Sequence, residues 1–268
     1  MSNIMGNMPG NIFDTHAHYT DRRFAQDRAQ LLRDLPANGV SLVLNCGSDL
    51  EDSAAALALA KEYPHVYAAC GVHPHEASGF GAQGTDELRR LLQDERCVAV
   101  GEIGLDYHYD FSPRDVQRDV FRRQLELAIE QNLPVILHDR EAHEETLHIL
   151  QEFYPKDAKN PGVVHCFSGS AEFAKEILAL GFTLGFGGAV TFNNAKRPLA
   201  IAAEIPLERL LLETDAPYMA PEPFRGKRCE SPHIAYVAEK IAAARGMDPQ
   251  ELIDICNQNG RTLFGFAG

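Results

Sequence analysis

The feature that most constrains the fold of this chain is a repeated alternation of short apolar, β-branched stretches with longer segments of helical periodicity. We count eight such units, which is the pattern of successive βα units around a parallel sheet. The predicted strands are Ile12–Thr15, Ser41–Asn45, Val66–Gly71, Val98–Gly101, Pro134–Leu137, Gly162–Val164, Thr183–Phe186 and Arg209–Leu212. The pattern therefore predicts an α/β fold built on parallel strands.

The number of units and the chain length together favour one closed barrel. A chain of 268 residues with 45% hydrophobic content suits a single domain with one large core. We predict a (β/α)8 TIM barrel over residues 1–268, although an open doubly wound sheet has the same local pattern. After the eighth strand, proline follows Ser231 and Asp248 as it does at many helix starts, so we expect an extra C-terminal helix.

Composition and charge limit the classes of function. The sequence has neither an apolar run of about 18 residues nor a basic and apolar start of the secretory type, so we expect a cytoplasmic protein without a membrane partner. Six cysteines lie far apart without a Cys-x-x-Cys pair, which indicates reduced, buried thiols. The formal charge of −13 argues against broad adhesion to nucleic acid, but it leaves room for a nucleic-acid substrate at a metal site. Nothing indicates an obligate protein partner.

Residues of metal-ligand type follow most of the predicted strands. Active sites of barrels lie at the C-terminal ends of the strands, so a barrel would bring these distant residues together around one mouth. A single histidine at a strand end is more often structural, but that interpretation weakens as such residues recur in equivalent positions. The candidate metal ligands are His16, His18, Glu102, His138, His165 and Asp215.

These ligand types indicate a pair of divalent ions. His16 and His18 are two residues apart on an extended chain, so both side chains point the same way and can chelate one ion. The whole set exceeds what one four-coordinate ion accepts with a position open for water, so we expect two divalent ions per chain. Glu102 has two oxygens and is the natural bridge between them.

Three carboxylates are the candidate catalytic residues. Besides the bridging Glu102, Asp215 can bind an ion and take the proton of the attacking water. By strand alternation Glu213 faces the same way as Asp215. Glu213 is therefore either a support for the site, a substrate contact, or a carboxylate held in a local hydrogen-bond network.

The motifs that hold these residues resemble those of the TatD family of metal-dependent deoxyribonucleases, within the amidohydrolase-like barrel superfamily. The resemblance covers almost the whole chain and implies a (β/α)8 barrel that hydrolyses DNA phosphodiesters, from the 3′ end and on single strands. It implies one ion on His16, His18, Glu102 and Asp215 and another on Glu102, His138 and His165. Magnesium supports the activity in the family, and a His-rich site of this kind can also hold zinc or manganese, so the two ions are expected to be Mg, Zn or Mn. Thr20 and Cys229 depart from the usual family residues. The motifs are Ile12–His18, Gly71–His75, Gly101–Asp106, His138, His165–Gly169 and Leu211–Tyr218.

Substrate contacts are expected in two loops. His73 is predicted to contact the substrate or a water at the metal site, or else to order its loop. Arg225, Lys227 and Arg228 are predicted to hold phosphate oxygens, unless they form an ordinary solvated run. The rings of the proline-rich loop 216–224 could stack on a base. The remaining histidines, His75 among them, are expected to be surface or packing residues.

Two other functions stay open at this point. A site of this kind also hydrolyses amides and esters, so an amidohydrolase acting on a substrate such as D-aminoacyl-tRNA is the alternative enzyme. A binding protein on an inherited barrel is the third possibility. A mere scaffold would need neither the bridging Glu102 nor the general base Asp215, which argues against it.

Overall fold

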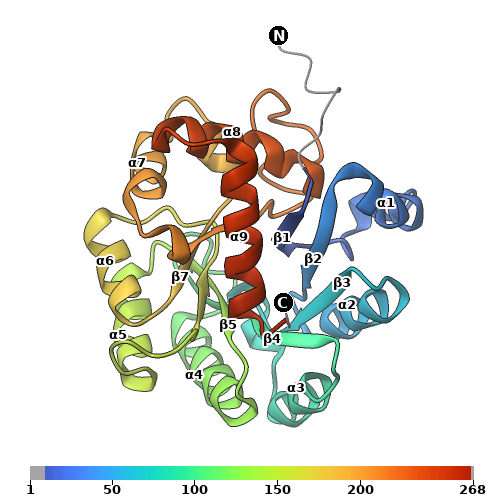
Figure 1. The fold of residues 1–268 in the computed structure, drawn as a ribbon. Coiled ribbons are helices and arrows are strands. Elements are labelled where there is room, and N and C mark those ends of the chain that lie inside the picture. The colour runs from blue at the N-terminus through green and yellow to red at the C-terminus, as the bar shows by residue number, and fades with distance from the viewer. Residues whose placement is uncertain (1–9, 267–268) are drawn as a thin grey trace.

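The apolar stretches pair in chain order, and every neighbouring pair of strands is parallel. This arrangement comes from a computed structural model that describes residues 10–266. The strands curve round into a barrel, which confirms the predicted fold class over an open sheet (Figure 1). They are β1 (Ile12–Ala17), β2 (Val40–Cys46), β3 (Val66–Cys70), β4 (Cys97–Asp106), β5 (Val135–Arg140), β6 (Gly162–Val164), β7 (Thr183–Phe186) and β8 (Leu210–Leu212).

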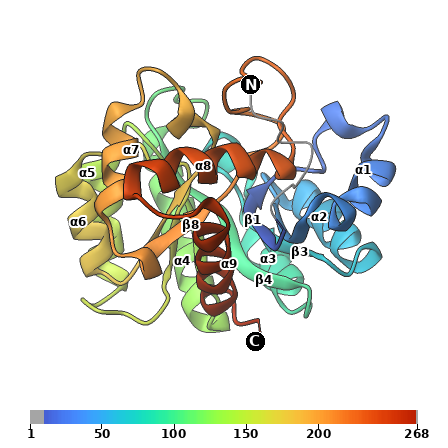
Figure 2. The same cartoon turned by 45° about the horizontal axis from the view of Figure 1, so that its top comes forward.

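Helices surround the strands, as Figures 1 and 2 show from two directions. A helix lies between each strand and the next, where the helical periodicity predicted one. The helix predicted at the C-terminus is present as α9. The helices are α1 (Arg28–Asp34), α2 (Leu50–Glu62), α3 (Gly84–Leu92), α4 (Arg114–Gln131), α5 (His143–Phe153), α6 (Ala171–Ala179), α7 (Lys196–Glu204), α8 (Ile234–Arg245) and α9 (Pro249–Leu263).

Side-chain and loop hydrogen bonds, rather than a regular ladder, close the barrel between β1 and β8. The Thr15 hydroxyl donates to the carbonyl of Leu212, and the backbone N–H of Asp215 donates to the carbonyl of His16 at 2.9 Å. Asp14 is fully buried and accepts hydrogen bonds from the hydroxyls of Thr214 and Ser231. Burial raises the pKa of Asp14 to about 7 despite these bonds. The seam therefore depends on a buried polar network.

Apolar side chains fill the barrel below the mouth, and the end of α9 seals it from underneath. The α9 backbone approaches β1 so closely that a Cβ on Gly260 would lie 2.7 Å from the Phe13 ring. The Phe13 and Phe264 rings meet edge to face at 6.0 Å. The interior cluster consists of Phe13, Leu42, Leu44, Cys46, Ala69, Ala99, Ile136, Val163, Leu211, Leu263 and Phe264.

The strands near the site are longer than the sequence predicts. β4 was expected to end at Gly101 but continues to Asp106, so Glu102 lies within the strand. β5 likewise continues past Leu137 to Arg140. The reason is that the two extensions pair with each other, with Gly104 opposite His138. Pairing fixes the directions of functional side chains that the sequence alone leaves on loops.

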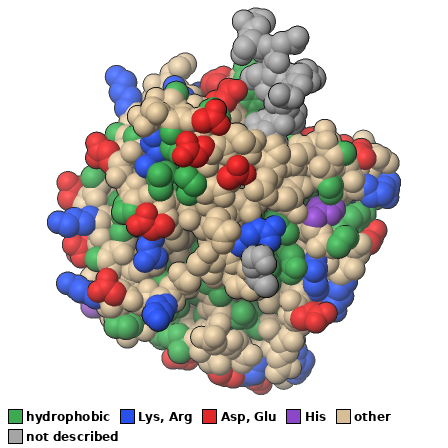
Figure 3. Space-filling view, viewed as in Figure 1, with side chains coloured by type: hydrophobic (Ala, Val, Ile, Leu, Met, Phe, Trp, Pro, Cys, Tyr) green, Lys and Arg blue, Asp and Glu red, His purple; other side chains and the backbone are tan. Residues whose placement is uncertain are grey.

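Surface charge, the hydropathy of the helices and the state of the cysteines complete the description of the fold. Acidic and basic side chains are interspersed over the face seen in Figure 3, so this face has no continuous basic patch. No helix among residues 10–266 is long and apolar enough to cross a membrane. All six cysteines are free; Cys166 is half-buried and the others are buried, which confirms the prediction of reduced thiols.

We expect Phe264→Ala to lower the free energy of unfolding by about 3 kcal/mol, because it removes a buried ring that seals the barrel. Urea denaturation followed by circular dichroism measures the change. Ile129→Ala is the control, because Ile129 is 50% exposed and its truncation should cost less than about 0.5 kcal/mol. Equal stability of the two variants would contradict the sealing role of Phe264.

Candidate metal centre

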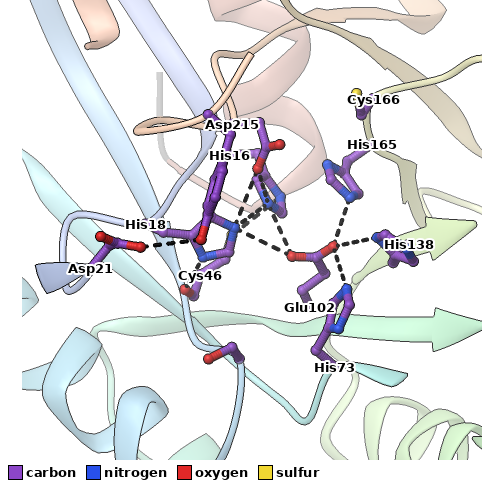
Figure 4. Close-up of polar contacts among 12 residues, drawn as sticks. His16, His18, Asp21, Cys46, His73, Glu102, His138, His165, Cys166 and Asp215 are labelled. Atoms are coloured by element: carbon purple, nitrogen blue, oxygen red, sulfur yellow. Dashed lines mark hydrogen bonds and ion pairs between the residues drawn. The ribbon is translucent and has the colours of Figure 1, made fainter. Parts of the chain in front are cut away.

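Five strands bring the six predicted ligand residues to one place at the mouth of the barrel (Figure 4). Glu102, on β4, lies at the centre with its two carboxylate oxygens facing opposite groups of side chains. The groups come from β1 and the end of β8 on one side, and from β5 and the end of β6 on the other. Residues more than 100 positions apart in the sequence are therefore in contact because the strands are adjacent or face each other across the barrel.

One group surrounds Glu102 Oε2. The Nε2 atoms of His16 and His18 lie 3.2 and 3.4 Å from this oxygen and only 3.0 Å from each other. Asp215 Oδ1 lies 3.7 Å from His16 Nε2 and 3.4 Å from His18 Nε2. Four ligand atoms thus point at a common space. Two of them belong to His16 and His18, which are two residues apart on an extended chain and therefore lie on the same face.

The other group surrounds Glu102 Oε1. His165 Nε2 lies 2.7 Å from this oxygen and His138 Nδ1 lies 2.9 Å from it. His73 Nε2, from the loop after β3, is 3.5 Å away. His73 was predicted as a substrate contact, and the structure brings it close enough to be a ligand as well.

Hydrogen bonds on the far side of the imidazole rings fix their orientation. His18 Nδ1 lies 2.9 Å from the carbonyl oxygen of Cys46, so it donates its proton there and leaves the Nε2 lone pair facing the cluster. His138 Nε2 lies 3.1 Å from Asp106 Oδ2, which leaves Nδ1 to face Glu102. Both rings are therefore oriented so that the nitrogen facing the centre can lose its proton and bind a cation.

Burial and neighbouring charges shift the pKa values of the cluster in opposite directions. Burial alone would raise the pKa of Glu102, but the charges of His165 and His16 hold it well below its usual range. Burial would lower the pKa of His18, but its bonds to Asp215 and Glu102 raise it to about 10. The cluster therefore stabilises positive charge at its centre.

The donor set fits divalent cations. Three groups have ligand atoms that all lie within 4.8 Å of one another, and the groups overlap through His16 and Glu102. Imidazole nitrogens and carboxylate oxygens in this number are ligands for Zn, Mn or Mg, and a cation would replace the protons that the buried cluster otherwise needs. The groups are His16, His18 and Asp215; His16, Glu102 and His165; and His73, Glu102 and His138.

Glu213 lies behind the centre rather than on its open side. It is fully buried, and its Oε1 accepts a hydrogen bond from the backbone N–H of Cys166 and lies 3.7 Å from His165 Nδ1. Its Oε2 lacks a hydrogen-bond partner among residues 10–266. Of the three roles left open by the sequence, this position agrees with support of His165 and disagrees with substrate contact.

The centre opens into a cleft of about 1040 Å³. Arg225 lines this cleft, whereas Lys227 and Arg228 are not among its lining residues. Arg228 instead forms ion pairs with Asp27 and Glu230, both at 2.7 Å. The structure thus brings one of the three basic residues of this loop to the site, because Arg228 turns toward its two carboxylates and Lys227 Nζ lies 5.8 Å from the Phe224 ring centroid.

Several of the residues that line the cleft were not assigned to the site in the sequence analysis. His75, expected to be a surface or packing residue, lies 2.8 Å from Asp106 Oδ2 and lines the cleft with Arg140. The signal for His75 was its spacing of two from His73, the same spacing as in the pair His16 and His18. Asp106 lies four residues beyond Glu102 on one strand, which places both on the same face. Tyr109 and Phe111 carried no comparable signal.

Known proteins resemble this chain over almost its full length. A family described as TatD related DNase matches residues 13–265. An uncharacterized metal-dependent hydrolase, YabD, of Bacillus subtilis is 42% identical over 253 residues, which cover 94% of this chain and 98% of that protein. The 3′-5′ ssDNA/RNA exonuclease TatD of Salmonella typhimurium is 35% identical and covers 94% of this chain and 98% of that protein. The crystal structure of YJJV, a TatD homologue from Escherichia coli K12, is 34% identical, superposes with a TM-score of 0.90, and covers 97% of this chain and 100% of that chain.

Glu102→Gln is expected to lose at least one divalent ion per chain, because a neutral amide cannot bridge two cations as a carboxylate does. Inductively coupled plasma mass spectrometry of desalted protein measures the metal content. Glu76→Gln is the matched control, since Glu76 is an exposed carboxylate of the same cleft. Full metal content in the Glu102 variant would remove the central role of this residue.

Proposed function

This chain belongs to the TatD-related DNase family, and from that premise we propose that it hydrolyses phosphodiester bonds of single-stranded DNA from the 3′ end. The observation that carries the proposal is the Glu102 carboxylate, which lies between two groups of imidazole nitrogens. The family match covers residues 13–265, and the Salmonella typhimurium relative is named for 3′-5′ exonuclease activity on single strands.

We infer that the site holds two divalent ions, of Mg, Mn or Zn. His16, His18 and Asp215 would hold one ion beside Glu102 Oε2. His138 and His165 would hold the other beside Glu102 Oε1, with His73 next to them. When bound, divalent ions lower the pKa of a water toward neutrality and offset the charge that the attacked phosphate gains.

Asp215 is the proposed general base. Its side chain is 19% exposed and lines the cleft, so it can reach a water there as well as the imidazoles behind it. Bonds to His18 and the charge of His16 outweigh its burial and lower the pKa of Asp215, which keeps the carboxylate ionised. It is ready to accept the proton that the attacking water releases.

Other residues of the chain position the substrate. Arg140 and Arg225 line the cleft and can donate hydrogen bonds to phosphate oxygens. Glu213 supports His165 from behind and does not enter the reaction. An open cleft of about 1040 Å³ with aromatic walls and two arginines suits a nucleotide strand better than a small amide, which needs a tight apolar pocket. The cytoplasmic location stays a prediction.

We expect 5′-labelled single-stranded DNA to be shortened progressively from its 3′ end when a divalent ion is supplied. His16→Ala and Asp215→Ala should each reduce the rate roughly 10²- to 10⁴-fold, because each removes a ligand or the proton acceptor. Denaturing gel electrophoresis with Mg²⁺ or Mn²⁺ measures the ladder of products, and EDTA provides the metal-free control.

Glu76→Gln should keep the wild-type rate, since Glu76 is exposed and belongs to none of the three ligand groups. Metal-loaded wild-type protein that leaves every DNA strand intact but hydrolyses carbonyl substrates such as D-aminoacyl-tRNA would contradict the proposal in favour of the amidohydrolase alternative.

A further inference from the structure

Exposed apolar side chains gather around the cleft. Among residues 10–266, the large hydrophobic side chains that are exposed are Tyr109, Phe111, Ile129, Tyr218 and Met219. All of these except Ile129 line the cleft that opens from the metal centre. Apolar side chains that leave the core and collect around one site are typical of a binding surface.

Two of the rings form a platform. Tyr109 and Phe111 belong to the loop after β4; their centroids are 5.4 Å apart and their planes differ by 28°. His75 supports both rings edge-on, at 5.4 Å from Tyr109 and 4.8 Å from Phe111. The rings are 55% and 66% exposed, so much of their surface is open to a ligand.

Asp106 holds this platform in place. Its Oδ1 accepts hydrogen bonds from the backbone N–H groups of His108 and Tyr109, at 3.0 and 2.8 Å. Its Oδ2 accepts from His75 at 2.8 Å and from His138 at 3.1 Å. One carboxylate therefore fixes the platform relative to the metal centre, which reduces the ordering cost when a ligand binds.

A further ring stands on the opposite wall. Tyr218 follows β8, and in a barrel with strands in the order one to eight, β4 and β8 lie across from each other. Its hydroxyl donates to Asp21, and the guanidinium of Arg23 lies 3.9 Å from its ring centroid. Tyr218 is 45% exposed, so a strand that enters the cleft passes between two aromatic walls.

The charges of the cleft do not favour a nucleic-acid backbone. Apart from the histidines of the centre and His75, its lining residues include seven carboxylates, two of them the proposed ligands Glu102 and Asp215, but only two basic side chains, Arg140 and Arg225. Away from the ions, phosphates would therefore be repelled rather than attracted. Beyond the ions and the two arginines, affinity for a strand therefore comes from its bases, and stacking on aromatic rings supplies affinity for any base.

We propose that Tyr109 and Phe111 form a nucleobase-stacking site for a nucleotide of a single strand whose end lies at the metal centre. Tyr218 receives a neighbouring base on the opposite wall. The inference rests on the proposed nuclease function and deepens it, because it states how the substrate is held. Bases of a duplex are already stacked and paired, so the site selects unpaired strands of either DNA or RNA without reading their sequence.

The test compares two 5′-labelled single strands, one normal and one with abasic tetrahydrofuran units at its last three positions. For the normal strand, the double variant Tyr109→Ala/Phe111→Ala should raise KM by roughly 5- to 100-fold, as expected for one lost stacking interaction. For the abasic strand, the KM of the double variant should stay close to that of the wild type. The preference for bases, measured as the KM for the abasic strand divided by the KM for the normal strand, should therefore fall toward one in the double variant.

The exchange variant Tyr109→Phe/Phe111→Tyr should keep the preference, because both positions remain aromatic. Ile129→Ala controls for the loss of an exposed apolar side chain outside the cleft. An unchanged preference in the double variant would overturn the stacking site, as would an equal rise of KM for both strands.

Binding of phosphorothioate-linked versions of the same strands, measured by fluorescence anisotropy, separates stacking from hydrolysis. The double variant should bind the normal strand more weakly than wild type does, whether or not cleavage occurs. Equal binding would overturn the stacking site, whereas base-dependent binding without any hydrolysis of unmodified DNA would count against the nuclease function alone.

Discussion

The Glu102 carboxylate is the interaction on which the rest of the site depends. Its two oxygens lie 3.2 Å from His16 Nε2 and 2.7 Å from His165 Nε2, so one side chain joins two groups of ligands that arrive from opposite sides of the barrel. Burying this carboxylate is costly unless positive charge surrounds it. The chain supplies that charge as imidazoles, and divalent ions would supply it more strongly.

The barrel scaffold holds the residues of this cluster in position. Strand pairing continues past the apolar part of β4 and β5, so His138 lies opposite Gly104 in a paired stretch, and the backbone N–H of Glu102 donates to the carbonyl of Gly47. Asp14 closes the seam beside His16, and the end of α9 seals the opposite end of the barrel with Phe264. A rigid scaffold of this kind keeps the ligands at their distances when a substrate binds.

Sequence reasoning was sufficient for the fold and for the position of the candidate ligands. The apolar pattern located the eight strands and the helical segments between them, and Asp248 before Pro249 marked the start of α9, because those signals are local. The strand-end rule then placed His16, Glu102 and Asp215 at one mouth. What it could not provide was the direction of individual side chains, as with Arg228, which pairs with Asp27 instead of lining the cleft. Nor could it identify Tyr109 and Phe111, because exposed rings on a loop become a platform only when Asp106 orders that loop.

The central claim is that one carboxylate bridges two cations. Its most direct test is a crystal structure of Mn²⁺-loaded protein with anomalous scattering measured at the manganese edge. The account predicts two anomalous peaks about 3.5–4 Å apart, with one Glu102 oxygen directed at each. A single peak that does not contact Glu102, or no peak among these imidazoles, would contradict it.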